Sequence, residues 1–382
     1  MTSADGVVVA MVSDTWADAV RRGFYSTADQ MIMSLMEDER VPRVLVADHP
    51  RGVLSRAKSL LRRDVSAPHT PFLRGVRPWV VSTRTPTTRS AIERRYRAYD
   101  RQLAISSRRN GMAAPSLVTF NLYHAAYGSH DWASRVCFYA QDDESAIPRK
   151  ADEAPLLSDA YRRVAERGIE VVAVSSVLLR RIDPTGPGHV VPNGVVPELW
   201  SNPSAAVRDR SESRTTVAYA GSIDSRLDVT AIAQLAAAGH AVQLAGHIAD
   251  AAVGRELEGL DGVTLLGAVP RASVASFLAS ADVCLMAHRR TPLTEAMSPL
   301  KVYEYLCTGR PVVATSLGSY AEEPDVRRNV TLVDAGGDYV RAVEDALRRG
   351  PLDESVRALL AESLSWRRRH EPVISRLSGS SP

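Results

Sequence analysis

The sequence predicts an α/β protein with two doubly wound parallel sheets, each in its own domain. Short apolar runs of strand length alternate with helical stretches along the chain, which is typical of a parallel sheet covered by helices. The chain has 382 residues, enough for two domains at roughly 100–200 residues each. Polar residues follow several of the apolar runs, at the strand ends where ligands bind in such sheets.

The first domain is predicted to span residues 1–200, with a polar linker at 201–214 that is poor in large apolar residues. Its turn after the first apolar run contains no G-x-G-x-x-G motif, so the fingerprint of a dinucleotide-binding dehydrogenase is absent. The runs predicted to be its strands are 6–12, 43–47, 116–123, 135–141 and 169–175.

The second domain is predicted to span residues 215–358, followed by a helix and a frayed tail over 359–382. Helices are expected between its apolar runs, so this sheet should also be parallel. The runs predicted to be its strands are 216–220, 241–246, 263–267, 283–286, 311–314 and 330–333.

The composition excludes several classes of protein. Hydrophobic residues make up 45% of the chain, and no apolar run reaches the roughly eighteen residues of a membrane-spanning helix. The N-terminus lacks the basic start of a secretory signal, so the predicted location is the cytoplasm. Cys137, Cys284 and Cys307 have apolar neighbours and no metal-ligand spacing, which argues against disulfides and against a zinc site.

The basic residues are concentrated in the segment 51–110. It contains fifteen Lys or Arg against three acidic residues, a local net charge of +12 in a chain whose total is +3. Such a segment either contacts an anionic membrane or another anionic partner, or it is simply a solvated surface. No nucleic-acid-binding motif accompanies it, so nucleic acid is not a predicted partner. A smaller group, His288, Arg289 and Arg290, either faces an anionic ligand or is exposed.

The stretch 298–315 contains a helix start, a helix stop and a buried strand. Ser298 is predicted to cap the helix and Pro299 to occupy its first position. Gly309 is placed to adopt the left-handed conformation that ends a helix, and Pro311 prevents the helix from resuming. We therefore predict a helix from 299 to 308.

Lys301 lies in the first turn of this helix, where a cation is unfavourable unless an anion such as a phosphate is present. Glu304 lies one turn further on the same face, and its carboxylate can accept two hydrogen bonds from a vicinal diol such as a ribose. The simpler alternative is a solvated ion pair. Earlier in the chain, Gly221 and Ser222 follow a predicted strand and allow close approach of a diphosphate, to which Arg226 can add a charge.

The run Ser298-Pro-Leu-Lys-Val-Tyr-Glu-Tyr-Leu-Cys-Thr-Gly-Arg-Pro-Val-Val-Ala314 resembles the C-terminal signature of GT-B fold glycosyltransferases of the family 4 type. In that family a Glu-x7-Glu motif lies against the nucleotide-sugar. Glu304 matches the second glutamate, which holds the ribose hydroxyls, whereas the first falls on Ala296, next to Glu295. The Pro-x-Lys-x-x-Glu-Tyr variant resembles a branch of polysaccharide and teichuronic-acid-type transferases, in which the lysine contacts the diphosphate.

The resemblance implies two Rossmann-like domains facing across a cleft, with the nucleotide in the second and the acceptor in the first. It also implies that the C-terminal helix crosses back onto the first domain, with Trp366 as its anchor, and that Arg226 replaces the usual basic diphosphate contacts. Further residues expected against the donor are Met297, Ser298, Pro299 and Leu300.

Candidate catalytic residues are expected where strands of the first domain end. Asp142 and Asp143 follow the run 135–141, in the loop that faces the donor sugar in the resembling family. One of them either deprotonates the acceptor hydroxyl or binds sugar hydroxyls, or else caps the next helix or binds a divalent metal ion. His124 follows the run 116–123 and is the weaker candidate, because a lone histidine there is more often structural.

The implied activity is metal-independent transfer of a sugar from a UDP-, GDP- or dTDP-sugar to an acceptor hydroxyl. The acceptor is a glycan, a lipid-linked glycan or a small molecule, in cell-envelope or extracellular polysaccharide synthesis, and no cofactor is expected. The segment 51–110 is expected to allow peripheral contact with the inner face of the cell membrane. The alternatives are a sugar-nucleotide epimerase or phosphorylase of the same fold, or a non-catalytic sugar-nucleotide-binding subunit.

Overall fold

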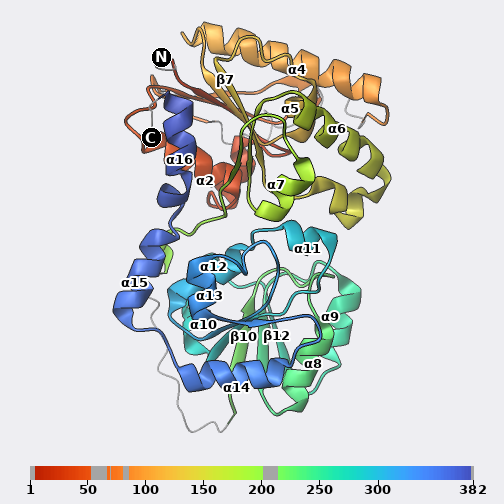
Figure 1. Cartoon of the computed structure of the whole chain (residues 1–382), viewed down its shortest axis with the longest axis vertical. Coiled ribbons are helices and arrows are strands. Elements are labelled where there is room, and N and C mark those ends of the chain that lie inside the picture. Colours follow the sequence, from red (N-terminus) through yellow and green to blue (C-terminus); the bar gives the residue numbers. More distant parts are fainter. Residues whose placement is uncertain (1–4, 53–66, 69, 81–85, 201–213, 380–382) are drawn as a thin grey trace. The chain divides into compact units, whose positions relative to one another are not determined.

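The computed structural model describes residues 5–52, 67–68, 70–80, 86–200 and 214–379 (Figure 1). It divides into unit 1, Met1–Pro192 with His370–Pro382, and unit 2, Asn193–Arg369. The predicted linker 201–214 lies outside the described residues, except for Arg214. None of the helices in the described ranges has the length and apolar character needed to span a bilayer.

Unit 1 is built on a sheet whose seven strands are all parallel. Three central strands are fully buried, as expected for strands covered by helices on both faces. In spatial order the strands are β4 (Leu73–Val76), β2 (Val44–Ala47), β1 (Val7–Ala10), β6 (Ser116–Thr119), β7 (Arg135–Ala140), β8 (Glu170–Ala173) and β9 (Gly188–Val190). A separate parallel pair is formed by β3 (Arg51–Gly52) and β5 (Trp79–Val80).

Helices lie on both faces of this sheet (Figure 1). They are α1 (Trp16–Arg21), α2 (Thr27–Met36), α4 (Arg89–Arg109), α5 (Leu122–Tyr127), α6 (Ala154–Glu166), α7 (Ser176–Ile182) and the C-terminal α16 (Trp366–Ser378). Two 3-10 helices, Glu144–Ala146 and Pro148–Glu153, follow β7.

Unit 2 has a second parallel sheet, which confirms the predicted doubly wound α/β class. Its strands in spatial order are β12 (Val263–Gly267), β11 (Ala241–Ala245), β10 (Thr216–Ala220), β13 (Val283–Met286), β14 (Val312–Thr315) and β15 (Val330–Val333). Its helices are α8 (Val229–Ala237), α9 (Ala251–Glu258), α10 (Arg271–Ser280), α11 (Pro292–Ala296), α12 (Leu300–Thr308), α13 (Pro324–Asn329), α14 (Tyr339–Arg349) and α15 (Glu354–Ser363).

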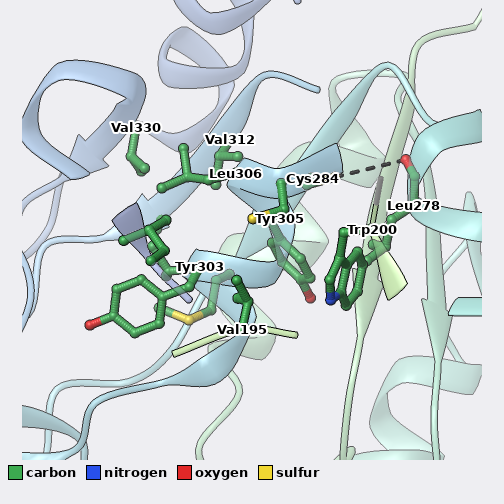
Figure 2. Packing of buried hydrophobic residues seen from close by; sticks show 14 of the residues in the cluster. Val195, Trp200, Leu278, Cys284, Tyr303, Tyr305, Leu306, Val312 and Val330 are labelled. Atoms are coloured by element: carbon green, nitrogen blue, oxygen red, sulfur yellow. Dashed lines mark hydrogen bonds between the residues drawn. The ribbon is translucent and has the colours of Figure 1, made fainter. Parts of the chain in front are cut away.

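Two apolar clusters form the core of unit 2, one on each face of the sheet. Successive residues of β10 alternate between them, because side chains along a strand point to opposite faces. One cluster contains Tyr303, Tyr305 and Leu306 of α12, packed with Val195 and Trp200 (Figure 2). Residues 193–200, predicted as the end of the first domain, therefore pack with unit 2.

The C-terminal helix returns to unit 1, as predicted, but its first residue, Trp366, lies in unit 2. Trp366 belongs to unit 2, where its backbone N–H donates to Val195 O at 3.0 Å. The contacts with unit 1 come from the following turns: His370 Nδ1 lies 2.9 Å from Ser34 Oγ, and Leu377 O accepts from Ser116 Oγ at 2.6 Å. The tryptophan is buried before the helix reaches unit 1.

A second difference concerns the predicted strand 116–123. The strand β6 ends at Thr119, because the Asn121 side chain caps the helix α5 by accepting a hydrogen bond from His124 N at 2.9 Å. His124 therefore lies inside a helix and does not follow a strand end.

Candidate functional site

Helix α12 starts at Leu300, one residue later than predicted. Pro299 occupies the N-cap position with extended backbone angles (φ −73°, ψ 116°), and it has no side-chain group that can accept a hydrogen bond from the first turn. The prediction that Ser298 caps the helix was therefore wrong. The helix end is confirmed, since Gly309 follows Thr308 in the left-handed conformation with φ 76°.

Ser298 instead fastens the loop before α12 to an earlier part of the chain. Its hydroxyl accepts from Asn193 N at 3.0 Å and lies 3.0 Å from the Tyr303 hydroxyl. The Asn193 side-chain amide donates to Ser298 O at 2.6 Å. The sequence pattern Pro-Asn-Gly marks a turn at Asn193 but does not show that this turn supports the helix.

Lys301 extends from the first turn of α12 across the end of β10. Gly221, the residue after this strand, has φ +152°, and a Cβ atom added to it would lie 1.9 Å from Lys301 Cε. The ammonium lies 5.6 Å from the centre of the Tyr219 ring. The strand end, the glycine turn and the helix start predicted from separate stretches of sequence thus come together around Lys301.

Four charged side chains interact electrostatically at the end of β10: those of Lys301, Glu304, Arg226 and Asp224. Burial, together with the charge of Arg226, lowers the pKa of Lys301 to about 8, while Glu304 and Asp224 act in the opposite direction. Burial alone would raise the pKa of Asp224, but hydrogen bonds and charge from Arg226, with the charge of Lys301, hold it below its usual value. The arrangement favours an added anion, which would raise the pKa of Lys301 and stabilise its charged form.

Arg226 forms a bidentate ion pair with Asp224. Its Nε and Nη2 atoms lie 2.9 and 2.6 Å from the two carboxylate oxygens. The proposed diphosphate contact would therefore compete with this ion pair. Ser222 is exposed, and its carbonyl accepts from the Tyr219 hydroxyl at 2.9 Å, so this residue shapes the turn after β10.

Glu304 is partly buried and close enough to Lys301 to affect its pKa. Ala296, at the position of the first family glutamate, is fully buried. The side chain of its neighbour Glu295 forms an ion pair with Arg290 at 2.9 Å and accepts a hydrogen bond from Gly318 N at 2.8 Å. Glu295 therefore orders the loop after β14. Met297 and Leu300 are partly buried beside these residues in sequence, and Pro299 and Ser298 are buried.

His288 is a buried histidine with no hydrogen-bond partner at Nδ1. Its backbone N–H donates to Thr315 Oγ1 at 2.8 Å, which holds it at the end of β13. Burial lowers its pKa well below the usual value, and the charges of Lys301 and Arg226 act in the same direction. His288 is therefore neutral at physiological pH.

In unit 1, Asp142 and Asp143 follow β7 as predicted but have different surroundings. Asp143 is buried and caps the 3-10 helix Glu144–Ala146, accepting from Ser145 N at 3.1 Å. It also forms an ion pair with Arg181. Asp142 is exposed, and its carbonyl accepts from the Tyr161 hydroxyl at 3.0 Å. Of the roles predicted for this residue, helix capping is therefore the one that matches the contacts of Asp143.

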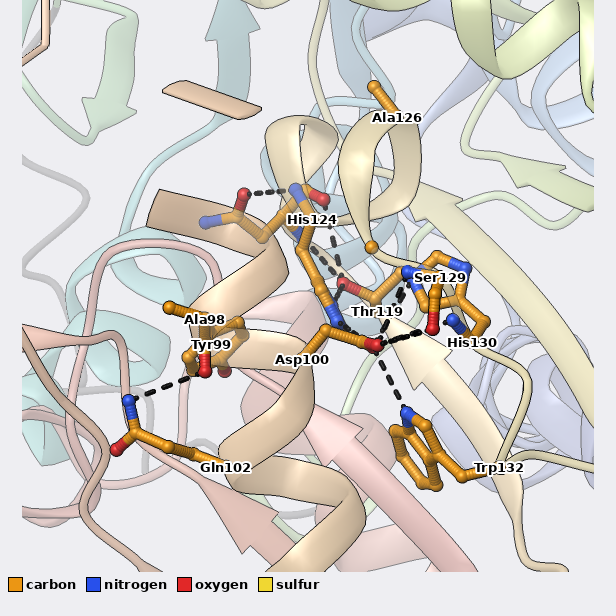
Figure 3. Close-up of polar contacts among 12 residues, drawn as sticks. Ala98, Tyr99, Asp100, Gln102, Thr119, His124, Ala126, Ser129, His130 and Trp132 are labelled. Carbon is orange, nitrogen blue, oxygen red and sulfur yellow. Dashed lines mark hydrogen bonds and ion pairs between the residues drawn. The ribbon is translucent and has the colours of Figure 1, made fainter. Parts of the chain in front are cut away.

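His124 lies in the interior of unit 1 (Figure 3). Its Nε2 is 3.0 Å from Asp100 Oδ1 and its Nδ1 is 3.0 Å from Thr119 Oγ1. Asp100 also accepts from Trp132 Nε1 at 3.1 Å and from the Ser129 backbone N–H at 3.2 Å. Both ring nitrogens of His124 are therefore used inside the domain, which is the geometry of a structural histidine.

Asp100, His124 and His130 place three possible metal-ligand atoms within 4.8 Å of one another. However, Arg167 Nη2 lies 3.3 Å from His130 Nδ1. A guanidinium only donates, so this contact puts the ring proton on Nε2, which lies 3.8 Å from Asp100 Oδ1. A metal ion would need that nitrogen deprotonated, and the cluster is better described as a hydrogen-bonded network.

The protein resembles solved structures along nearly its whole length. Sucrose-phosphate synthase from Thermosynechococcus elongatus matches with a TM-score of 0.67 at 16% identity, covering 98% of this chain and 100% of that one. A glycosyltransferase from Rickettsia africae matches with a TM-score of 0.66 at 12% identity, covering 99% and 100%. WaaG, a glycosyltransferase involved in lipopolysaccharide biosynthesis, matches with a TM-score of 0.59 at 14% identity, covering 98% and 100%. Together with the two parallel sheets, these likenesses show that the protein has the GT-B fold.

Sequence comparison finds similarity to glycosyltransferases over part of the chain. Residues 214–349 match the family model of the group 1 glycosyl transferases. TuaH of Bacillus subtilis, a glycosyltransferase assigned to teichuronic acid biosynthesis, is 27% identical over an alignment of 228 residues that covers 55% of this chain and 57% of the relative. Residues 214–349 thus match the group 1 glycosyl transferases and the whole chain has the GT-B fold, which confirms the resemblance found in the sequence.

Proposed function

We propose that the protein transfers a sugar from a nucleoside diphosphate sugar to an acceptor hydroxyl. The observation that carries this proposal is the position of Lys301, partly buried at the start of α12 and lying across Gly221 at the end of β10. A cation, helix N–H groups and a glycine turn meet there, which is a favourable environment for a diphosphate.

In the proposed reaction, the acceptor oxygen bonds to the anomeric carbon while the bond from that carbon to the diphosphate breaks. Lys301 and the N-terminus of α12 stabilise the charge that develops on the departing diphosphate. Glu304 accepts hydrogen bonds from the ribose hydroxyls. The acceptor proton passes to a base, for which we propose Asp142, because it is exposed after β7 whereas Asp143 is buried in an ion pair.

We propose that no bound metal is needed, because Lys301 and the helix N-terminus supply the positive charge that a cation would otherwise provide. The chemistry of the site suits UDP-, GDP- and dTDP-sugars equally, since the groups on α12 would contact the diphosphate and ribose that these donors share. The relative TuaH and the neighbour WaaG support an acceptor in polysaccharide or glycolipid synthesis.

We also propose peripheral contact with an anionic membrane at the inner face of the cell membrane, through helix α4. Arg94, Arg97, Arg101 and Arg108 are exposed at helical spacing along it. Ile105 on the same helix and the nearby Trp79 are about half exposed, and apolar side chains of this kind insert between lipid headgroups. Residues 53–66 of the basic segment lie outside the described residues.

The first experiment is a thermal-shift screen with UDP, GDP, ADP and dTDP, followed by release of free nucleotide from the matching sugar nucleotides. Transfer to an added acceptor supports the proposed function, and loss of turnover in Glu304→Ala supports the site. Conversion of the sugar nucleotide without an acceptor would indicate an epimerase or phosphorylase. Tight binding without turnover under any acceptor condition would indicate a binding subunit.

A further inference from the structure

Two residues of unit 2 mark the points where the chain passes between the units. The chain enters unit 2 at Asn193, directly after Pro192, and leaves it after Arg369, directly before His370. Hydrogen bonds connect both residues to the same small region, the start of helix α12. Asn193 is bonded directly to Ser298, which precedes the helix, whereas Arg369 is connected to it through Glu323 and Tyr303.

The entry point is tied directly to the loop before α12. Asn193 donates through its backbone N–H to Ser298 Oγ at 3.0 Å and through its side chain to Ser298 O at 2.6 Å. Both residues are buried, so water does not readily replace these hydrogen bonds. Lys301 lies only three residues beyond Ser298.

The exit point is tied to the same loop through a tyrosine and a glutamate. The Tyr303 hydroxyl lies 3.0 Å from Ser298 Oγ and donates to Glu323 Oε1 at 2.5 Å. Glu323 Oε2 accepts from Arg369 Nη2 at 2.8 Å, and the Arg369 guanidinium also lies 5.0 Å from the centre of the Tyr303 ring. Figure 2 shows the Tyr303 hydroxyl pointing away from the apolar cluster that buries its ring.

Helix α12 therefore presents two different faces. Successive residues are about 100° apart around a helix, so Tyr303 points nearly opposite to Lys301. Lys301 crosses Gly221 on the proposed donor side, while on the other side the Tyr303 hydroxyl contacts Ser298 and Glu323. These two residues are the hydrogen-bond partners of Asn193 and Arg369, respectively. A shift of the first turn that accompanies binding of an anion would strain or relax these hydrogen bonds.

We propose that Asn193, Tyr303 and Arg369 are positioning residues that couple occupation of the donor site to the two segments connecting the units. This inference rests on the proposed function, because it assumes that a nucleoside diphosphate binds at Lys301. By reciprocity, ordering of the connecting segments should also raise the affinity for the nucleotide. None of the three residues needs to touch the donor.

The test is hydrogen–deuterium exchange of peptides covering 190–196 and 366–372, with and without the nucleoside diphosphate that gives the largest thermal shift. Binding should slow exchange in both segments of the wild type, whereas Tyr303→Phe should lose most of this protection. Nucleotide affinity should fall about tenfold, within the usual range of coupling between sites. Asn193→Ala should remove protection mainly from 190–196, which provides a second variant if Tyr303→Phe does not fold.

Tyr339→Phe is the matched control. Its hydroxyl is also buried and bonded to a protein partner, Thr315 Oγ1 at 2.8 Å, but that partner lies outside the chain of contacts described above. This variant should keep both protection and affinity. If the wild type binds the nucleotide and both Tyr303→Phe and Asn193→Ala keep the full protection from exchange, the proposed coupling is wrong, whereas the proposed function still stands. Absence of any nucleotide binding by the wild type would overturn both the coupling and the proposed function.

Discussion

Lys301 Cε lies 1.9 Å from the point that a Cβ atom would occupy on Gly221, so the lysine chain fills the space that any other residue would need. Gly221 also has φ +152°, in a region that side-chain-bearing residues rarely adopt. A helix-borne cation and a strand-end glycine from sequence positions eighty residues apart thus form one surface.

Gly221→Ala should displace Lys301 and lower nucleoside diphosphate affinity by about tenfold or more, as loss of a charge-assisted contact does. Titration calorimetry with the nucleotide that gives the largest thermal shift measures the effect. Gly239→Ala is the matched control, because Gly239 has φ +92° but nothing within 4 Å of an added Cβ. Both variants carry backbone strain, and only the first should lose affinity. Equal affinities would separate Gly221 from the site.

Nucleotide affinity should fall as the pH rises above about 8, where burial and Arg226 place the pKa of Lys301. The protonated lysine binds the diphosphate, so each further pH unit should cost up to tenfold in affinity until the pKa of the complex is passed. The dissociation constant between pH 7 and 9.5 gives the profile. Lys301→Met should bind more weakly at pH 7 and show little change over this range. A matching slope in the variant would assign the titration to another group.

The sequence predicted those parts of the site that depend on short-range signals. Gly309 and Pro311 end α12 through their backbone conformations, which do not depend on what the helix packs against. The apolar run after them forms β14 in the described structure. Lys301 and Glu304 lie on one helix, so their common face follows from helical spacing alone. The spacing Asp224-x-Arg226 is also a local signal, but the predicted role of Arg226 did not include its ion pair with Asp224.

Other parts depend on contacts between distant positions, which spacing does not reveal. Ser298 has the residue type of an N-cap, but its hydroxyl is bonded to Asn193, 105 positions earlier, and the helix begins at Leu300. Trp366, predicted to anchor the last helix on the first domain, lies in unit 2, where its backbone N–H donates to Val195 O. An aromatic residue indicates burial but not the domain in which it is buried.

Asp142→Ala and Asp143→Ala should affect different properties. Asp143 caps a helix and pairs with Arg181, so its removal should reduce the free energy of unfolding by about 1–3 kcal/mol. Asp142→Ala should leave the urea midpoint unchanged and lower the rate of sugar transfer by roughly 10²–10⁴-fold, as removal of a general base does. Chemical unfolding and transfer rates measured on both proteins decide the assignment. The reverse pattern would make Asp143 the base.

Addition of EDTA should leave sugar transfer unchanged if Lys301 and the helix N-terminus supply the charge for the leaving diphosphate. The measurement is the transfer rate after dialysis against chelator, with Mg²⁺ or Mn²⁺ added back. Lys301→Met should lose about 10²–10³-fold in rate under the same conditions, as removal of one transition-state contact does in other enzymes. A rate that disappears with EDTA and returns with metal would contradict the proposed metal independence.

The buried network around Asp100 should make the protein less stable in mild acid. Burial and the charge of His124 lower the pKa of His130 to about 3, so this ring is neutral in the folded protein but takes up a proton near pH 6.5 when unfolded. The stability that depends on this difference is complete above pH 6.5 and is lost as the pH falls toward 3. Between pH 7 and 5, His130 alone should account for a loss of about 2 kcal/mol.

Urea unfolding of the wild type and His130→Asn at pH 7 and pH 5 isolates this contribution. Asparagine suits the test because His130 has φ 61°, a left-handed conformation that asparagine tolerates better than most residues. His49 and His370, whose pKa values burial lowers to about 4 and about 3, shift stability in the same direction in both proteins and cancel in the comparison. The variant should be less stable at pH 7 but lose less on acidification. Equal losses in the two proteins would show that His130 is protonated in the folded state, with Asp100 stabilising its charge.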